Sequence, residues 1–218
     1  MKKIAIILSG CGVYDGSEIH EAVLTMLAIT QQGAQYRCFA PNIEQYHVVN
    51  HLTGDIDESQ SRNVLVESAR IARGDIDPIT ELVVDEFDAV VLPGGFGAAK
   101  NLCDFAIKGE NCSMQSDVLA ACQAFAKANK PAGYICIAPA MIALVYGQGS
   151  QGTIGTDSDI AKQLTTIGLE HINCSVEQVV IDEKHKVIST PAYMLAGDIS
   201  EAALGINKLI TNLLGMCE

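Results

Sequence analysis

The sequence lacks the signatures of several common protein classes. No stretch approaches the roughly 18 consecutive apolar residues that a membrane-spanning helix needs. No two cysteines have CxxC spacing, and no cysteine–histidine cluster has the spacing of a zinc site. The chain contains no Gly-Lys-Ser or Gly-Lys-Thr, and its glycine-rich stretch at residues 93–97 is not GxGxxG. These absences predict a protein without a membrane helix, a metal site or a nucleotide site.

Positive charge is scarce as well. The chain has 14 lysine and arginine residues against 26 aspartate and glutamate residues, a formal net charge of −12 at pH 7. An acidic surface of this kind repels phosphate backbones and anionic lipid headgroups. We therefore predict that neither nucleic acids nor membranes are partners, and that the charge serves solubility.

Length and composition predict one folded unit. The chain has 218 residues, of which 49% are hydrophobic, enough for a single α/β domain over residues 1–218. The apolar run at residues 4–8 is too short for a signal peptide and is better explained as a buried strand. Without such a signal, the cysteines are expected to be reduced thiols of a cytoplasmic protein, most of them packing residues. There are eight: Cys11, Cys38, Cys103, Cys112, Cys122, Cys136, Cys174 and Cys217.

Strand and helix patterns alternate along the chain. This predicts a doubly wound, flavodoxin-like α/β fold, with a mostly parallel sheet and helices on both faces. Ligands of such sheets bind outside the carboxyl ends of the strands, so the loops after residues 8, 92 and 135 are the candidate site. Strands are expected at 3–8, 36–39, 88–92, 131–135, 179–182 and 186–189, with 153–155 extended. Residues from about 41 to 62 are expected to form an excursion at the sheet edge that contains a short strand at 46–50. Helices are expected at 18–29, 63–71, 118–128, 138–145, 160–167 and 199–214.

Cys136 lies where a strand is expected to turn into a helix. Pro139 follows within the first helical turn, where its missing N–H costs nothing. This is the layout of a nucleophile elbow, in which free N–H groups at the helix start favour a thiolate. Cys136 is therefore the candidate nucleophile, and the alternative is a buried packing residue.

The other two loops offer supporting groups. Glycines at 94, 95 and 97 allow backbone N–H groups to approach a bound oxygen, as an oxyanion hole requires, although glycine also serves ordinary turns. Glu18, at the start of the first helix, could move a proton beside Cys136. Its alternative is a first-turn acid that favours the helix dipole. Asp15 or Ser17 is expected to cap this helix.

With these loops in place, the chain resembles the enhancing lycopene biosynthesis protein family of the PfpI and Parkinsonism-associated protein superfamily. The resemblance runs over essentially the whole chain. It implies a class I glutamine amidotransferase-like fold. The segments that carry the resemblance are 7–21, 50–54, 92–102, 136–141, 153–157 and 190–195. Segment 92–102 begins Leu92-Pro93-Gly94-Gly95-Phe96-Gly97, and segment 136–141 reads Cys136-Ile137-Ala138-Pro139-Ala140-Met141.

The resemblance also implies a function. Cys136 matches the superfamily's elbow cysteine, and Glu18 is matched to the acid that contacts that cysteine. The family is linked to a cofactor-free glyoxalase activity that converts glyoxal to glycolate, to a possible deglycase role and, genetically, to isoprenoid production. A homodimer is expected by analogy. We therefore hypothesise that the thiolate of Cys136 attacks an aldehyde, Glu18 shuttles the proton, and the N–H groups of Gly95 and Ile137 hold the oxyanion.

The chain departs from the family pattern in its histidines. Ile137 directly follows the cysteine where several relatives have histidine, and no histidine follows in the segment Gly155-Thr156-Asp157. A glutamine-hydrolysing triad is therefore not expected, and an amidase is one alternative. The other is a binding or redox-sensing protein, in which Cys11 in the first loop supplies a second thiol near Cys136.

Overall fold

The computed structural model describes residues 1–217 and contains one large sheet and one small one. The strands are β1 (Lys3–Ile7), β2 (Gln35–Ala40), β3 (Ile76–Pro78), β4 (Ala89–Leu92), β5 (Ala132–Ile135), β6 (Ser150–Gly152), β7 (Leu169–His171), β8 (Val180–Asp182) and β9 (Val187–Thr190). The large sheet has the order β3-β2-β1-β4-β5-β9-β8, and β6 pairs with β7 apart from it. Within the described residues, only the β8–β9 pair is antiparallel.

Helices surround this sheet. The α-helices are α1 (Ile19–Gln31), α2 (Val64–Ile71), α3 (Phe105–Lys108), α4 (Ser116–Lys127), α5 (Ile142–Tyr146), α6 (Ser158–Ile167) and α7 (Ile199–Met216). Short turns of 3₁₀ helix are η1 (Ile79–Glu81), η2 (Val84–Glu86), η4 (Gly109–Asn111), η5 (Ala138–Met141) and η6 (Ala192–Met194), and η3 (Ala98–Leu102) is a π-helix. The mostly parallel, helix-covered sheet expected from the sequence is confirmed.

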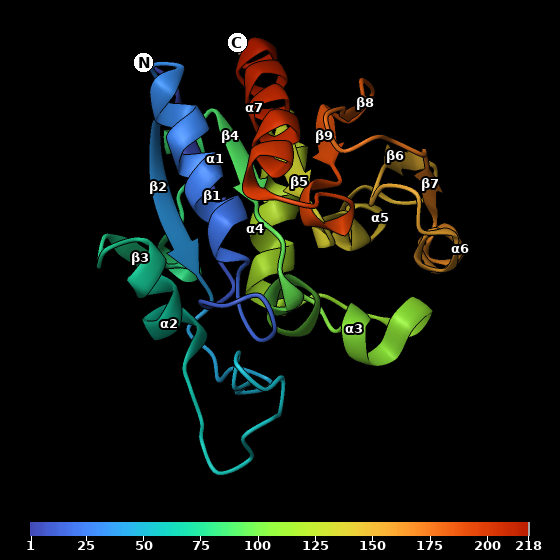
Figure 1. The fold of residues 1–218 in the computed structure, drawn as a ribbon. Helices are drawn as coiled ribbons and strands as arrows, with labels where there is room; N and C mark the ends of the chain where they lie inside the picture. The colour runs from blue at the N-terminus through green and yellow to red at the C-terminus, as the bar shows by residue number, and fades with distance from the viewer. Residues whose placement is uncertain (218) are drawn as a thin grey trace.

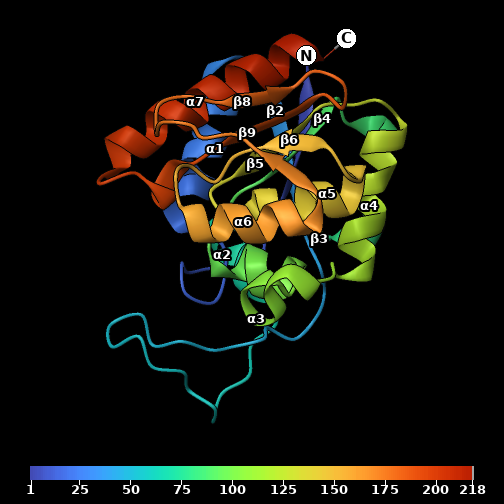
Figure 2. The same ribbon diagram turned by 90° about the vertical axis from the view of Figure 1, so that its right-hand side faces the viewer.

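Strand β1 shows why both faces of the sheet are covered. Successive side chains of a strand point to opposite faces, and all the side chains at positions 4–7 are fully buried. Ile4 and Ile6 join the core beneath α1 and α7, whereas Ala5 and Ile7 join the core that contains Phe125 of α4. Figure 1 shows α1 and α7 side by side on one face, and Figure 2 shows α4 on the opposite side. A continuous apolar strand therefore lies at the centre of a three-layer fold.

Residues 41–63 form the excursion expected for about 41–62, but they lack the short strand predicted within it. They project from the carboxyl end of the sheet as a long excursion (Figure 1), and the strand expected at 46–50 is absent, with Val49 forming only an isolated bridge to Ile56. The excursion is held by side chains of other loops instead of a strand partner. The Val49 N–H donates to the Asp15 carboxylate at 2.7 Å, and the Tyr46 N–H donates to the Asn101 side chain at 2.9 Å.

Two short pairings were not predicted. Strand β3 extends the sheet beyond β2. Strand β6, which directly precedes the stretch 153–155 that was expected to be extended, pairs with β7. Strands β3, β6 and β7 have three residues each, which is too few for an alternating pattern to be recognised in the sequence. Among the described residues, no helix has both the length and the apolar character needed to cross a membrane.

Candidate active site

Cys136 occupies a sharp turn between β5 and η5. Its φ is +63°, a left-handed conformation that residues other than glycine adopt rarely, and its N–H donates to the Thr190 carbonyl of β9 at 3.0 Å. Pro139 lies in the first turn of η5, as expected. The turn directs the thiol into a cavity while leaving the residue only 7% exposed. The elbow geometry predicted from the sequence is confirmed, and the backbone strain falls where a nucleophile would stand.

The acid in contact with this thiol is Glu21, which the sequence analysis did not identify. Glu21 lies in the first turn of α1, is fully buried, and has its carboxyl hydrogen-bonded to the Cys136 thiol. Its two oxygens also accept from backbone N–H groups, one from Gly94 at 2.9 Å and one from Tyr193 at 3.2 Å. Three separate loops therefore converge on one buried carboxyl group.

Burial shifts the titration of both partners. Burial, and then the negative charge of Glu18, raise the pKa of Glu21 from 4.5 to about 8. Burial and the charge of Glu21 raise the pKa of Cys136 well above its ordinary value, whereas hydrogen bonds from the backbone N–H groups of Gly95 and Ile137 oppose that shift. The resting thiol is therefore protonated and donates to Glu21, with two N–H groups ready to stabilise negative charge on the sulfur.

Glu18 has a different place from the one expected. It was predicted to contact Cys136, but it is the N-cap of α1: its carboxylate accepts from the Glu21 N–H at 2.7 Å. Capping by Asp15 or Ser17 is accordingly wrong. Glu18 is 9% exposed and lines the same cavity as Cys136, so it remains within the site although Glu21 makes the contact. Its part in proton transfer stays a prediction.

Gly95 and Ile137, the two predicted oxyanion donors, both direct their N–H groups at the Cys136 sulfur. Gly95 reaches this position with a φ of +90°, which glycine adopts at little cost. Its loop is fixed by the Glu18 N–H, which donates to the Gly94 carbonyl at 2.9 Å. The two N–H groups are therefore close to any oxygen that forms on a carbon bound to the sulfur. That they hold such an oxygen stays a prediction.

A cavity of about 500 Å³ opens in front of the thiol. Most of its wall is apolar and is built mainly from the loop after β4, α3, α6 and η6. Among the residues that line it are Phe96, Phe105, Ile160, Gln163, Tyr193 and Met194.

The histidines do not complete an amidotransferase triad. No histidine is among the described residues of the cavity wall. His171 accepts from the Ile154 N–H, and His185 pairs with Asp182 at 2.7 Å. His20 is linked to the site through Tyr193 of the cavity wall, because its Nδ1 lies 2.8 Å from the Tyr193 hydroxyl. Residues 1–217 also contain no group of three histidine, cysteine or acidic side chains that could hold a metal ion.

Cys11 does not share the cavity with Cys136. It is half-buried in the loop after β1, and burial together with the charge of Glu67 in α2 raises its pKa. It is not among the described residues of the cavity wall. The structure therefore gives no support to a paired response of the two thiols.

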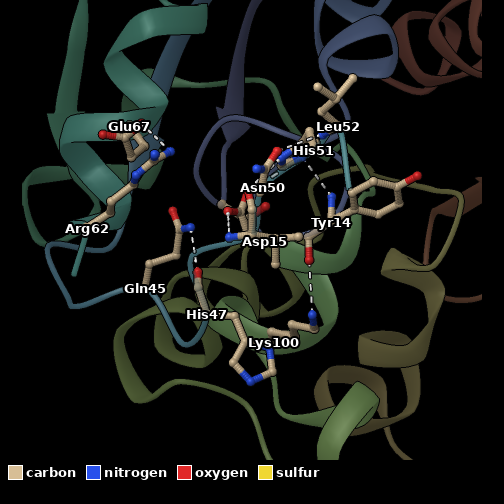
Figure 3. Close-up of polar contacts among 12 residues, drawn as sticks. Tyr14, Asp15, Gln45, His47, Asn50, His51, Leu52, Arg62, Glu67 and Lys100 are labelled. Atoms are coloured by element: carbon tan, nitrogen blue, oxygen red, sulfur yellow. Dashed lines mark hydrogen bonds and ion pairs between the residues drawn. The ribbon is translucent and has the colours of Figure 1, made fainter. Parts of the chain in front are cut away.

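The loop that follows Cys11 is anchored on Asp15, as Figure 3 shows. Asp15 is 1% exposed, and one of its carboxylate oxygens accepts from the Val49 N–H. The Tyr14 N–H donates to Nε2 of His51 at 3.1 Å, and the Tyr14 carbonyl accepts from Lys100 at 3.0 Å. Because the same loop carries Val13 and Glu18 into the cavity wall, the excursion supports one side of the site.

Replacing Asp15 should loosen this support. In Asp15→Ala the buried Val49 N–H loses its acceptor, which costs about 1 to 3 kcal/mol. We expect amide hydrogens of residues 41–63 to exchange about tenfold faster or more, as followed by hydrogen-exchange mass spectrometry. Asp55→Ala, at an exposed position of the excursion, is the matched control. Equal exchange in the two variants would show that Asp15 does not anchor the excursion.

Comparison with known proteins places the chain among relatives of similar length. No family model matches it. It is 39% identical over 221 residues to the mitochondrial ES1 protein homolog of Rattus norvegicus, a match that covers 97% of this chain and 83% of the relative. It is also 39% identical to the human mitochondrial glutamine amidotransferase-like class 1 domain-containing protein 3, covering 97% of this chain and 82% of that protein.

Solved structures agree with the observed fold. The isoprenoid biosynthesis protein with amidotransferase-like domain from Ehrlichia chaffeensis superposes with a TM-score of 0.92 and 36% identity, covering 99% of each chain. Glyoxalase III from Candida albicans superposes with a TM-score of 0.63 and covers 100% of this chain and 98% of its own. At 13% identity, the second likeness shows a shared fold and no more.

Proposed function

Because this chain belongs to the family of the ES1 proteins and of the isoprenoid biosynthesis protein with amidotransferase-like domain, we propose that it is a cofactor-independent glyoxalase-type enzyme. The proposed reaction converts glyoxal and water to glycolate. The observation that carries the proposal is the Cys136 thiol, which contacts the buried Glu21 carboxyl and two backbone N–H groups beside a cavity that Cys136 lines. A nucleophile, a base and oxyanion donors are the groups that this chemistry needs.

The reaction begins with the thiol. Glu21 accepts the thiol proton while the sulfur of Cys136 bonds to one aldehyde carbon of glyoxal, whose oxygen becomes an alkoxide. The N–H groups of Gly95 and Ile137 stabilise this alkoxide until it is protonated to a hemithioacetal. The proton lost by the sulfur and the proton gained by the oxygen balance, so this step leaves the net charge of the site unchanged.

The next steps move hydrogen between the two carbons. A base removes the proton from the carbon bound to sulfur, giving an enediol, and a proton is returned to the second carbon. The first carbon is thereby oxidised to a thioester and the second reduced to an alcohol, so no external oxidant or reductant is required. Glu18 is the proposed carrier of this proton, because it is the acid that lines the cavity. Water then hydrolyses the thioester, which releases glycolate and restores the thiol.

Turnover by site variants tests the proposal. We expect Cys136→Ala to convert no glyoxal and Glu18→Gln to be slower by about a hundredfold or more, the usual contribution of a general acid–base group. The measurement is the rate of glyoxal loss and glycolate formation. Cys174→Ala is the matched control, because Cys174 is 8% exposed and lies outside the cavity wall.

The same assay separates the alternatives. A Cys136→Ala variant as fast as the parent protein would end the thiol mechanism. A parent protein without turnover would favour the second candidate, a binding or sensing protein. The small exposed fraction of Cys136 supports this second candidate. An amidase is less well supported, because no histidine is in the described wall of the cavity. Localisation in the cytoplasm and a homodimer both stay predictions.

A further inference from the structure

The cavity in front of Cys136 is far larger than glyoxal requires. Its volume of about 500 Å³ falls within the roughly 300 to 1,000 Å³ of pockets that enclose drug-sized ligands. Glyoxal, the smallest dialdehyde, would occupy only the end beside the sulfur. The remaining space is lined by Phe96, Phe105, Ile160 and Met194, which come from four separate segments of the chain. A built apolar wall of this kind is typical of a site that buries a hydrocarbon group.

The wall also excludes charged substrates. Among the described residues that line the cavity there is no lysine, arginine or histidine, and the only charged one is the acid Glu18. Lys100 lies over the Phe96 ring but donates to the Tyr14 carbonyl and does not belong to the wall. A phosphate or carboxylate on the substrate would therefore enter without a counter-charge, at a large cost in desolvation.

We propose that the preferred substrates of this site are uncharged 2-oxoaldehydes that carry an apolar substituent, with the aldehyde at Cys136 and the substituent against Phe96, Phe105 and Ile160. This inference rests on the proposed glyoxalase-type function and specifies its substrate class. The aldehyde carbon forms the bond to sulfur and ends as the carboxylate, and the neighbouring ketone carbon ends as the alcohol. Phenylglyoxal thus gives mandelate, with the same internal balance of hydrogen and electrons as glyoxal.

Competing aldehydes provide the test. The parent protein is assayed with glyoxal, methylglyoxal and phenylglyoxal, and the products glycolate, lactate and mandelate are measured. We expect kcat/KM for phenylglyoxal to exceed that for glyoxal by about tenfold or more, since burial of an apolar group in such a pocket gives discrimination of this order. A kcat/KM for glyoxal equal to or above that for phenylglyoxal would overturn the inference and leave the proposed function standing.

A variant of the cavity wall sharpens this test. Ile160→Asp sets a carboxylate against the substituent, and the acid stands in the first turn of α6, where the helix dipole favours a negative charge. We expect the ratio of phenylglyoxal to glyoxal kcat/KM to fall by at least about tenfold. Ile199→Asp makes the same change in the first turn of α7, at an exposed position outside the cavity, and should keep the parent ratio. An unchanged ratio in Ile160→Asp would overturn the placement of the substituent.

Binding without turnover distinguishes the two failures. Acetophenone has the phenyl ketone of phenylglyoxal but lacks the aldehyde, so titration calorimetry reports its binding whether or not the protein is an enzyme. If no aldehyde is turned over, the proposed function fails. Saturable binding of acetophenone that Ile160→Asp removes would then still support an apolar carbonyl ligand, and absence of binding by the parent protein would overturn it.

Discussion

Glu21→Gln is expected to lose about a hundredfold or more in kcat/KM for glyoxal while the protein remains folded. The amide cannot accept the proton of the Cys136 thiol, which Glu21 contacts in the structure. In the parent protein the pKa of Glu21 is raised to about 8, so the carboxylate that accepts this proton accumulates as pH rises through that value. We therefore expect parent turnover to rise between pH 7 and pH 9, and this rise to be absent from Glu21→Gln.

The same substitution should change stability in a direction that depends on pH. The pKa of Glu21 is raised in the folded state, so its contribution to stability is fully present below about 4.5 and is lost as pH rises through about 8. A shift of this size corresponds to roughly 5 kcal/mol at high pH. Glutamine avoids that loss but leaves the N–H of either Gly94 or Tyr193 without an acceptor, at about 1 to 3 kcal/mol.

Unfolding by denaturant at two pH values measures the balance. We expect Glu21→Gln to be more stable than the parent at pH 9, by on the order of 2 kcal/mol, and less stable at pH 4.5. Glu201→Gln, the same change at an exposed first-turn acid of α7, should behave like the parent at both values. A Glu21→Gln protein that is less stable than the parent at both pH values would show that the charged form of Glu21 does not destabilise the folded protein. Undiminished turnover would remove Glu21 from the mechanism.

The main elements of the fold were predictable because their patterns are local. The strands expected at 88–92 and 131–135 are mostly apolar and end in a turn, and the structure has β4 and β5 there. The closing helix was expected at 199–214 and spans Ile199–Met216. The excursion at 41–63 was expected, but the contacts that hold it were not predictable in the same way. Its backbone bonds to Asp15 and Asn101, which are distant in sequence, so no local pattern records them.

The site was predicted in part. Cys136 could be found because a strand, a turn and a proline within a short segment define an elbow. Glu21 was missed although the sequence contains a signal for it. It shares the buried face of α1 with Thr25 and Ile29, at a spacing of four residues, and a carboxylate on an apolar helix face needs a special partner. Glu18 was predicted as the site acid because it stands at the start of the helix. An acid at that position is also expected simply because it stabilises the helix N-terminus.

The cavity could not be predicted, because its wall is assembled from distant parts of the chain. Phe105 belongs to a four-residue helix that has too few residues for a periodic pattern, and Ile160 lies on an amphipathic helix whose packing partner is unknown from the sequence. Only the folded arrangement of α3 and α6 brings these side chains in front of Cys136. The proposed substrate preference therefore depends on residues outside the motif around Cys136.

Gly95→Ala is expected to damage both the fold and the site. A Cβ at this position would lie 2.3 Å from the Glu18 nitrogen and 2.5 Å from the Gly16 oxygen, and both are backbone atoms that cannot turn aside. The φ of +90° adds about 1 to 2 kcal/mol for any residue with a Cβ. Together with the overpacking, we expect a loss of about 3 kcal/mol or more in the free energy of unfolding.

Gly54→Ala separates the two causes. Gly54 has a similar φ of +81°, but no atom lies within 4 Å of its added Cβ, so only the backbone penalty applies. We expect Gly54→Ala to lose about 1 to 2 kcal/mol and to keep parent turnover. Gly95→Ala should instead lose turnover even at temperatures where it is folded, since relief of the clash moves the loop and withdraws the Gly95 N–H from the Cys136 sulfur. If the two variants unfolded at the same denaturant concentration and turned over glyoxal equally, the close contact of this loop with the start of α1 would have no role in the site.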